Sequence, residues 1–409
     1  MNNKLNRFIW KMIYTLPILY IIMPIISRII STYFTTYAYM LIIIWAIVGI
    51  VLGNGIISLN KYCGGILLPF ILFNMLTFLT RSESLVLWGY SILLNFLPIV
   101  LGYFVVYHRG RDVSYYRNII LIAFAITTIT TCVGLIRYPF AARVLATIES
   151  ANDVDAILYN WQNIGGYEFV YMAVLLYPLL ILAYKRKKIG LIPTIVSVIT
   201  LFFMVILSEY TTALLLLMIT SLLFLVRRNL TSKDILVFLL FSIICMFVLD
   251  SVLSDFLQWV GSLTGSETMI ERLNSLAEGK IGLEQSESNR IFLYERSIQT
   301  FFSNPLFGTM LKGGGSVGGH SFILDTIGVY GICGGILLFF MYRKIYRLFF
   351  APFRNKAGYG YVLWLFFQAI LLSCINTGMW LSVLTLFAPI ILYKIYDDGK
   401  MSYEDSVDY

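Results

Sequence analysis

The feature that most limits the fold of this chain is a succession of apolar runs, each of roughly 16 to 22 residues, the length that crosses about 30 Å of hydrocarbon. Twelve such runs lie near 8–27, 37–53, 64–80, 86–106, 118–136, 167–184, 190–208, 211–226, 235–253, 321–342, 358–375 and 377–395. With 59% hydrophobic and only 13% charged residues, the chain has too little polar surface for a soluble globule. We therefore expect an all-α polytopic membrane protein, a single domain over residues 1–409 with about twelve transmembrane helices.

The basic residues predict how these spans are oriented. If the N-terminus is cytoplasmic, 21 of the 30 Lys and Arg residues fall in cytoplasmic segments, which is the positive-inside pattern. The first run is too long for a signal-peptide core and no small-residue cleavage pattern follows it, so we expect it to be retained. The sequence thus predicts a multi-pass protein of the cytoplasmic membrane with both termini in the cytoplasm. The net charge of +8 fits attraction to anionic inner-leaflet lipid and predicts no nucleic-acid partner.

Two of the predicted exoplasmic segments are long, 137–166 and 254–320. They contain most of the basic residues on that side: Arg137, Arg143, Arg272, Lys280, Arg290, Arg296 and Lys312. Long external loops on a bundle with otherwise short connections are where a binding or reaction site is built. The second loop, which precedes the tenth span, is the stronger candidate.

Within the second loop, an amphipathic pattern over residues 288–302 predicts a helix that ends at Asn304-Pro305. Helical spacing places Arg290 and Tyr294 on one face and turns Arg296 well away from Arg290. The two arginines are therefore not expected to share a ligand unless the helix is broken.

His320 is the only histidine on the predicted exoplasmic side. It follows a glycine-rich stretch, 308–319, and precedes an apolar run whose one carboxylate is Asp325. The glycines are interpreted as letting the loop pass close to a bulky ligand while the histidine stays movable. A carboxylate inside a membrane span is a functional candidate, and Asp325 is expected either to pair with a loop arginine or, slightly less favoured, to orient His320.

This region resembles the signature region of the O-antigen and capsule polymerase (Wzy-type) and O-antigen ligase superfamily. The resemblance covers about residues 288–340, and beyond it extends only to span number and loop placement. The residues that carry it are Asn289-Arg290, Asn304-Pro305-Leu306-Phe307-Gly308, the glycine-rich stretch, His320-Ser321, Asp325 and Tyr330-Gly331-Ile332-Cys333-Gly334-Gly335. It implies transfer of a growing glycan from undecaprenyl pyrophosphate to a sugar hydroxyl of a lipid-linked repeat unit, without metal or cofactor. The partners it implies are a chain-length regulator and a flippase of the same pathway.

Such a transfer needs positive charge against the phosphates and a base for the acceptor hydroxyl. Guanidinium suits the first task and imidazole the second. His320 and Arg290 are therefore the predicted catalytic residues. The predicted substrate-binding residues are Arg137, Arg143, Tyr294, Arg296 and Asp325.

Each of these residues also has a simpler interpretation. His320 could contact the glycan or only stabilise its loop, and Arg290 could form an ion pair with Glu287 or Glu295. Arg137 and Arg143 could be interfacial anchors beside a span. Two carboxylates, Asp153 and Asp155, are too weak a signal for a divalent cation, and no metal is predicted.

One departure from the superfamily bears on substrate binding. Members often carry a Ser-Arg pair in the turn between the seventh and eighth spans, where this chain has Ser208-Glu209. Arg137 or Arg143 would then have to bind the pyrophosphate. This departure favours a polymerase modestly over a ligase-like glycosyltransferase.

Two other classes of function stay open at the level of sequence. A flippase or transporter of lipid-linked sugars fits twelve spans, although the sequence shows no pair of similar halves. A non-catalytic scaffold for the assembly machinery fits the span count but leaves the basic loops unexplained.

Overall fold

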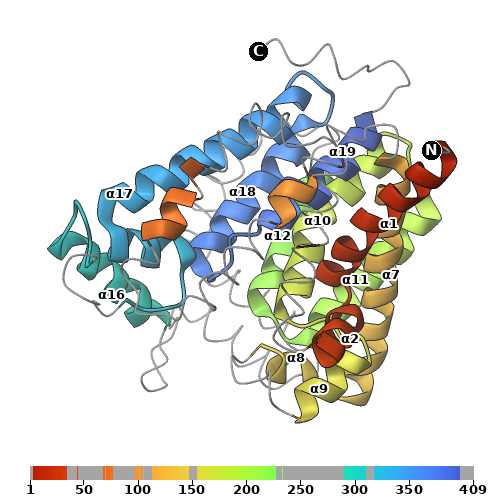
Figure 1. Cartoon of the computed structure of the whole chain (residues 1–409), viewed down its shortest axis with the longest axis horizontal. Coiled ribbons are helices and arrows are strands. Elements are labelled where there is room, and N and C mark those ends of the chain that lie inside the picture. The colour runs from red at the N-terminus through yellow and green to blue at the C-terminus, as the bar shows by residue number, and fades with distance from the viewer. Residues whose placement is uncertain are drawn as a thin grey trace.

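The computed structural model describes residues 3–34, 44, 68–69, 71–76, 97–102, 105, 113–146, 154–226, 233, 290–309 and 317–396. Within these ranges every regular element is helical (Figure 1). Four of the described helices are long and apolar enough to cross a membrane, and a bent helix pair raises the number to five. An all-α protein with several candidate spans is thus confirmed. The predicted spans at 37–53, 64–80, 86–106 and 235–253 lie wholly or mostly outside the described residues, so the count of twelve stays a prediction.

The long helices differ in how far the rest of the bundle encloses them. They are α7 (Val113–Arg137), α10 (Tyr167–Lys185), α11 (Leu191–Ser208) and α17 (Phe322–Ile345). In α10, 67% of the apolar stretch is buried, against 28% in α11. An apolar helix that the protein itself leaves uncovered fits a hydrocarbon solvent. We conclude that α10 lies inside the bundle and α11 at its edge.

Shorter apolar helices complete the described bundle around α10. They are α12 (Thr211–Val226), α18 (Tyr359–Ile375), the π-helix η8 (Ser382–Phe387) and α19 (Ala388–Tyr396). One polar contact joins α18 to α12, because the Trp364 indole and the Gln368 amide both donate to the Thr220 hydroxyl, at 2.9 and 2.8 Å. Polar side chains buried among apolar helices need such partners, and they fix which helix faces lie against each other.

The bundle has two chemically different ends. At the end called here the α16 end, the Phe322 N–H donates to the Asn376 carbonyl at 2.9 Å, which joins the start of α17 to the end of α18. At the opposite end, the basic end, Lys185 lies over the Tyr361 ring and Arg186 over the Tyr396 ring. The basic runs 185–188 and 343–347 belong to the basic end. This separation along the bundle agrees with the sequence, whereas the end that faces the cytoplasm stays a prediction.

The first apolar run is not one straight helix. Its two parts, α1 (Asn3–Ile22) and α2 (Pro24–Phe34), meet at an angle of 109°. Proline lacks an N–H and disfavours helical geometry in the residue before it, so the helix ends at Ile22. The predicted span over 8–27 is thus a bent helix pair, and whether it crosses the membrane stays a prediction.

The first long segment after α7 folds back onto that helix. It contains α8 (Ala141–Val144) and α9 (Val154–Trp161), and its key residue is Asn163, which is buried at a φ of 58°. The Asn163 amide donates to the hydroxyls of Thr127 and Thr130, and its oxygen accepts from the Ile25 N–H. One asparagine thus ties α2, α7 and the segment before α10 together at the α16 end.

Candidate functional site

The predicted helix of the second loop is confirmed as α16 (Arg290–Ser303), one residue longer at its C-terminus than the pattern indicated. It packs along the first half of α17, as Figure 1 shows in teal and light blue. The facing side of α16 is buried through Leu293 and Ser297. The helix ends where Asn304 donates its N–H to the Phe301 carbonyl and proline follows.

The turn after α16 docks into a break in α17. At Gly331 the backbone leaves helical geometry, with φ 61° and ψ −152°. The N–H groups of Ile332 and Cys333 donate instead to the carbonyls of Pro305 and Leu306, at 2.8 and 3.4 Å. A Cβ at Gly331 would lie 2.5 Å from the Leu306 backbone, so only glycine fits there.

Two further glycines of the region that resembles the superfamily, Gly308 and Gly318, are needed for backbone packing. A Cβ on Gly308 would lie 2.4 Å from the Val329 backbone, and one on Gly318 would lie 2.1 Å from the Leu293 carbonyl oxygen. Gly308 and Gly318 are thus required by backbone packing, whereas the close approach of a ligand stays a prediction. Gly319 differs, because its φ is +77° and no described atom lies within 4 Å of its Cβ position.

A short chain of hydrogen bonds fixes the loop before α17. The Gly318 N–H donates to the Ser297 hydroxyl at 3.0 Å, and this hydroxyl lies 2.6 Å from Asp325 Oδ1, to which it donates. The other carboxylate oxygen of Asp325 accepts the Ser321 N–H at 3.0 Å. The Ser321 hydroxyl in turn caps α17 by accepting from the Leu324 N–H. Residues 318 and 321 are thus held on both sides of His320.

His320 itself is exposed, directly before the cap of α17. None of the residues that the structure describes forms a hydrogen bond or ion pair with its imidazole. The backbone around the ring is fixed while the ring remains accessible. This is the arrangement that a general base for an incoming hydroxyl requires.

The described contacts of Asp325 are with serines. Its two oxygens accept from the Ser297 hydroxyl and the Ser321 N–H, and among the described side chains it pairs with no arginine and has no bond to His320. The side chains of Arg272 and Arg290 lie outside the described residues, so pairing with a loop arginine stays untested. The carboxylate positions the His320 loop through the backbone and joins α16 to α17.

Tyr294 also has a positioning contact. Its hydroxyl donates to the Ile375 carbonyl at 2.8 Å, which ties α16 to the last residue of α18. Arg290, one turn earlier, is the first residue of α16, and its side chain lies outside the described residues. The predicted ion pair between Arg290 and Glu287 or Glu295 also stays untested for that reason.

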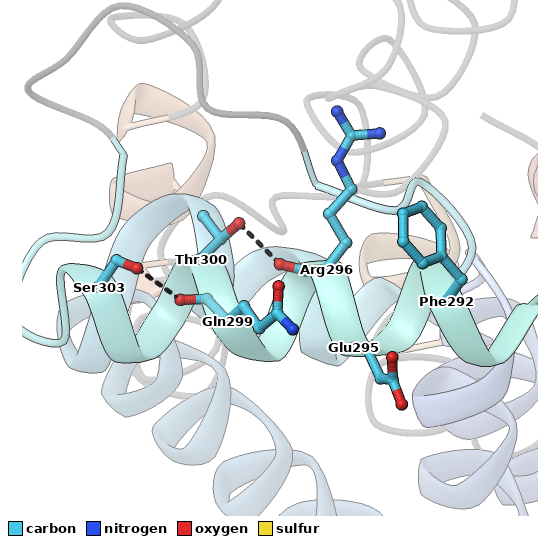
Figure 2. A pocket seen from close by; sticks show the side chains of 6 residues that line it. All are labelled: Phe292, Glu295, Arg296, Gln299, Thr300 and Ser303. Carbon is cyan, nitrogen blue, oxygen red and sulfur yellow. Dashed lines mark hydrogen bonds between the residues drawn. The ribbon is translucent and has the colours of Figure 1, made fainter.

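Arg296 lines a hollow of about 540 Å³ on the outer face of α16 (Figure 2). The hollow is lined by Phe292, Glu295, Arg296, Gln299, Thr300 and Ser303. Figure 2 shows the Arg296 guanidinium extending away from the helix, on the opposite side from the Glu295 carboxylate. The Thr300 and Ser303 hydroxyls donate to the Arg296 and Gln299 carbonyls at 2.7 and 2.9 Å. A cation with hydroxyl and amide groups beside it suits a phosphate or a sugar.

Arg137 and Arg143 lie elsewhere on the α16 end. Arg137 is the exposed last residue of α7, and its guanidinium lies over the ring of Tyr138 at 5.5 Å from the centroid. Arg143 belongs to α8, and its side chain is outside the description. Figure 1 shows α8 and α9 well apart from α16. The structure therefore places Arg296 and His320 on the α16–α17 pair, whereas Arg137 and Arg143 belong to α7 and α8, away from that pair.

The acidic pair considered for a cation is described only in part. Asp155 begins the first turn of α9, whereas Asp153 lies outside the described residues. Among the side chains that are described, no group of three or more His, Cys, Asp or Glu residues could hold a metal ion.

Sequence reasoning missed three residues at this end, Ser297, Asn376 and Trp380. Ser297 is an ordinary polar residue of an amphipathic helix. Asn376 is the one residue between the predicted spans 358–375 and 377–395, and Trp380 lies in the second of these apolar runs. Their roles depend on contacts across the bundle, and nothing in the local pattern indicates them.

Comparison with models of known protein families gives no match to this chain, and comparison with curated protein sequences gives none either. The superfamily resemblance therefore stays a prediction from the residues that carry it.

Proposed function

We propose that this chain is a membrane glycan polymerase of surface polysaccharide assembly. In the reaction, the hydroxyl of a sugar on one lipid-linked repeat unit replaces undecaprenyl pyrophosphate at the end of a growing glycan. The resemblance over residues 288–340 supports this reaction class, and the apolar helices support the membrane setting.

The observation that carries the proposal is the environment of His320. An exposed imidazole is placed on a loop whose backbone is fixed by Ser297, Asp325 and Ser321. The same hydrogen bonds attach that loop to α16, the helix that carries Arg290 and Arg296. A base and cations presented by one rigid helix pair is an arrangement suited to group transfer from a pyrophosphate.

The proposed step balances as a displacement at the anomeric carbon. His320 accepts the proton of the acceptor hydroxyl, and the hydroxyl oxygen forms a bond to the anomeric carbon of the donor glycan. The bond from that carbon to the pyrophosphate oxygen breaks, and the electron pair leaves with the pyrophosphate. Arg290 stabilises the negative charge that grows on the leaving group, whereas Arg296, on another face of the unbroken α16, contacts another part of the substrate.

A flippase of lipid-linked sugars is the second candidate, because two described helices are discontinuous. The α1–α2 pair bends by 109° and α17 breaks at Gly331. Broken helices are common in transporters, where their free backbone groups bind substrate. In α17, however, the backbone N–H groups beyond the break are bonded to Pro305 and Leu306, so they are not available to a substrate.

The test is to incubate the purified full chain with one lipid-linked repeat unit and measure glycan length by gel electrophoresis. We expect polymer with the wild type and only single repeat units with His320→Ala or Arg290→Ala. Since His320 is exposed and the fold does not use its ring, His320→Ala should keep the wild-type thermal stability. Arg347→Ala is the matched control, because Arg347 is an exposed arginine at the basic end.

Two results would contradict the proposal, and a third would remove the support that Arg290→Ala gives. Wild-type chain lengths from His320→Ala would remove the catalytic role of the imidazole. Failure of the wild type to form polymer, together with transfer of the lipid across vesicle membranes, would establish the flippase instead. Loss of polymer in Arg347→Ala would show that the assay responds to any lost cation.

A further inference from the structure

An aromatic cluster at the α16 end has features that the proposed chemistry does not use. It consists of Tyr167 and Tyr171 from α10, Tyr210 before α12, and Trp380 between α18 and η8, and is called here the Trp380 cluster. The Trp380 ring lies 5.6 Å from Tyr171 and 6.5 Å from Tyr167, and Tyr210 lies 5.4 Å from Tyr167, centroid to centroid. Four aromatic rings from three separate segments thus meet at one place.

Trp380 is strained and has an unsatisfied donor. Its φ is 54°, a left-handed conformation that is unusual for a bulky side chain. The side chain is only 7% exposed, and its indole N–H has no hydrogen-bond partner among the residues that the structure describes. Buried donors without partners are rare, and strained residues of this kind cluster at functional sites. Two independent observations therefore single out the same residue.

A second unsatisfied donor lies four residues earlier in the same turn. Asn376 is 5% exposed, and in the described part of the chain its side-chain NH₂ group has no partner, although its backbone N–H and carbonyl are both bonded. The turn is firmly held, since the Ser373 hydroxyl donates to the Gly378 carbonyl at 2.9 Å and Tyr342 donates to the Met379 carbonyl at 3.3 Å. The backbone of the turn is therefore held, while neither side-chain donor bonds to any other described residue.

The turn also connects the Trp380 cluster to the loop that carries His320. The Asn376 carbonyl accepts the N–H of Phe322, which is the second residue after His320. A ligand held by this turn would therefore lie close to the start of α17.

An acceptor is available in the first turn of α10. Glu168 lies between Tyr167 and Tyr171 in sequence, at the start of an apolar helix. In the part of the chain that is described, no basic residue or donor is paired with its carboxylate. A carboxylate at such a position is a functional candidate rather than a packing residue.

We propose that the Trp380 cluster, with Asn376 and Glu168, is a saccharide-binding subsite. A sugar ring has an apolar C–H face, which fits aromatic side chains, and hydroxyl groups that both accept and donate hydrogen bonds. The two unsatisfied N–H donors match hydroxyl oxygens, and the Glu168 carboxylate matches hydroxyl protons. Among the described side chains of this set none is a cation, which favours a sugar over a phosphate as the ligand. The inference rests on the proposed function for the ligand class, a glycan on a lipid carrier.

Binding requires a movement of Trp380. Its indole nitrogen is closed off from solvent, so a sugar hydroxyl reaches it only after the ring turns. The strained backbone at Trp380 and the π-helix η8 that follows are conformations that can relax when it does.

The test compares two probes on the full chain in lipid nanodiscs. One is undecaprenyl pyrophosphate carrying the repeat-unit glycan of the host cell, and the other is the same lipid without glycan. We expect the wild type to bind the glycan-bearing lipid about tenfold more tightly, and Trp380→Phe or Asn376→Leu to reduce that ratio at least about threefold. Because each variant removes an unsatisfied donor, the thermal unfolding temperature should stay equal or rise.

Trp364→Phe is the matched control. It removes an indole N–H that is satisfied by Thr220, so it should lower the unfolding temperature and keep the affinity ratio. Equal affinity of the wild type for the two lipids, or an unchanged ratio in Trp380→Phe, would overturn the subsite. The latter result would show that Trp380 serves packing alone.

Polymer formation, measured on the same preparations, separates this inference from the proposed function. Polymer with an unchanged affinity ratio in Trp380→Phe refutes the subsite and leaves the polymerase. A ratio that falls in Trp380→Phe, with no polymer from the wild type, refutes the polymerase and leaves the saccharide subsite.

Discussion

At the scale of single residues, Ser297 has the most consequential position on α16. Its hydroxyl accepts the Gly318 N–H and donates to Asp325, and its side chain is fully buried. One small residue thus joins the His320 loop, α16 and α17.

We predict that Ser297→Ala destabilises the protein by about 1–3 kcal/mol, because it leaves a buried N–H and a carboxylate oxygen without their partner. Thermal unfolding in detergent measures this. Ser303→Ala on the same helix is the control, since the Ser303 hydroxyl is exposed and bonds only within α16; its effect should stay below about 0.5 kcal/mol. Equal effects of the two changes would refute the role of Ser297.

At the scale of elements, the break in α17 defines the α16–α17 pair. Carbonyls of the turn 304–309 accept the N–H groups of Ile332 and Cys333, which would otherwise bond within the helix. Separating α16 from α17 would therefore leave these two backbone donors without acceptors. The break depends on a conformation at Gly331 that other residues do not adopt.

Two glycine substitutions in α17 should have opposite effects. In Gly331→Ala the alanine would have to adopt a backbone conformation that only glycine tolerates, and its Cβ would lie 2.5 Å from the Leu306 backbone. We expect this change to lower the free energy of unfolding by at least about 3 kcal/mol. Gly335 lies in the same helix, and the nearest described atom to its added Cβ is Ile327 Cγ2 at 3.8 Å. Gly335→Ala should therefore leave the free energy of unfolding unchanged or raise it by up to about 1 kcal/mol. Expression level and thermal unfolding of the two variants check this, and a tolerated Gly331→Ala would show that the break is not required.

The element scale also shows where local patterns are sufficient. The apolar periodicity of residues 288–302 and the Asn304-Pro305 stop predicted α16 and its end to within one residue, because these signals act within one or two helical turns. The bend between α1 and α2 was missed although Pro24 is visible in the sequence. Prolines occur inside membrane helices, Pro17 in α1 and Pro178 in α10 among them, and only packing decides which one breaks the helix.

At the scale of the whole molecule, the separation of charge between the two ends predicts the orientation in the membrane. Lys188 is exposed at the basic end and Gln299 is exposed on α16. The positive-inside rule places Lys188 in the cytoplasm and Gln299 outside.

A membrane-impermeant maleimide applied to intact cells should label Gln299→Cys. It should label Lys188→Cys only after the membrane is permeabilised. The parent protein, with its native cysteines, gives the background. The reverse labelling pattern would place His320 in the cytoplasm and would contradict the proposed function as well as the orientation.

The sequence by itself predicted the candidate membrane spans, the helical architecture of the described residues, the two-ended distribution of charge and the end of α16 to within one residue. These properties depend on apolar length, local periodicity and composition, which the order of residues contains directly. It also singled out His320, which the structure leaves exposed on a fixed loop.

Only the tertiary structure decided what Asp325, Tyr294, Gly331 and Trp380 do. Asp325 accepts from a serine 28 residues earlier, and Tyr294 donates to a carbonyl 81 residues away. The unsatisfied donors of Trp380 and Asn376 become visible only when neighbouring helices are in place. Such contacts depend on which helix faces meet, and no local pattern of residues specifies that choice.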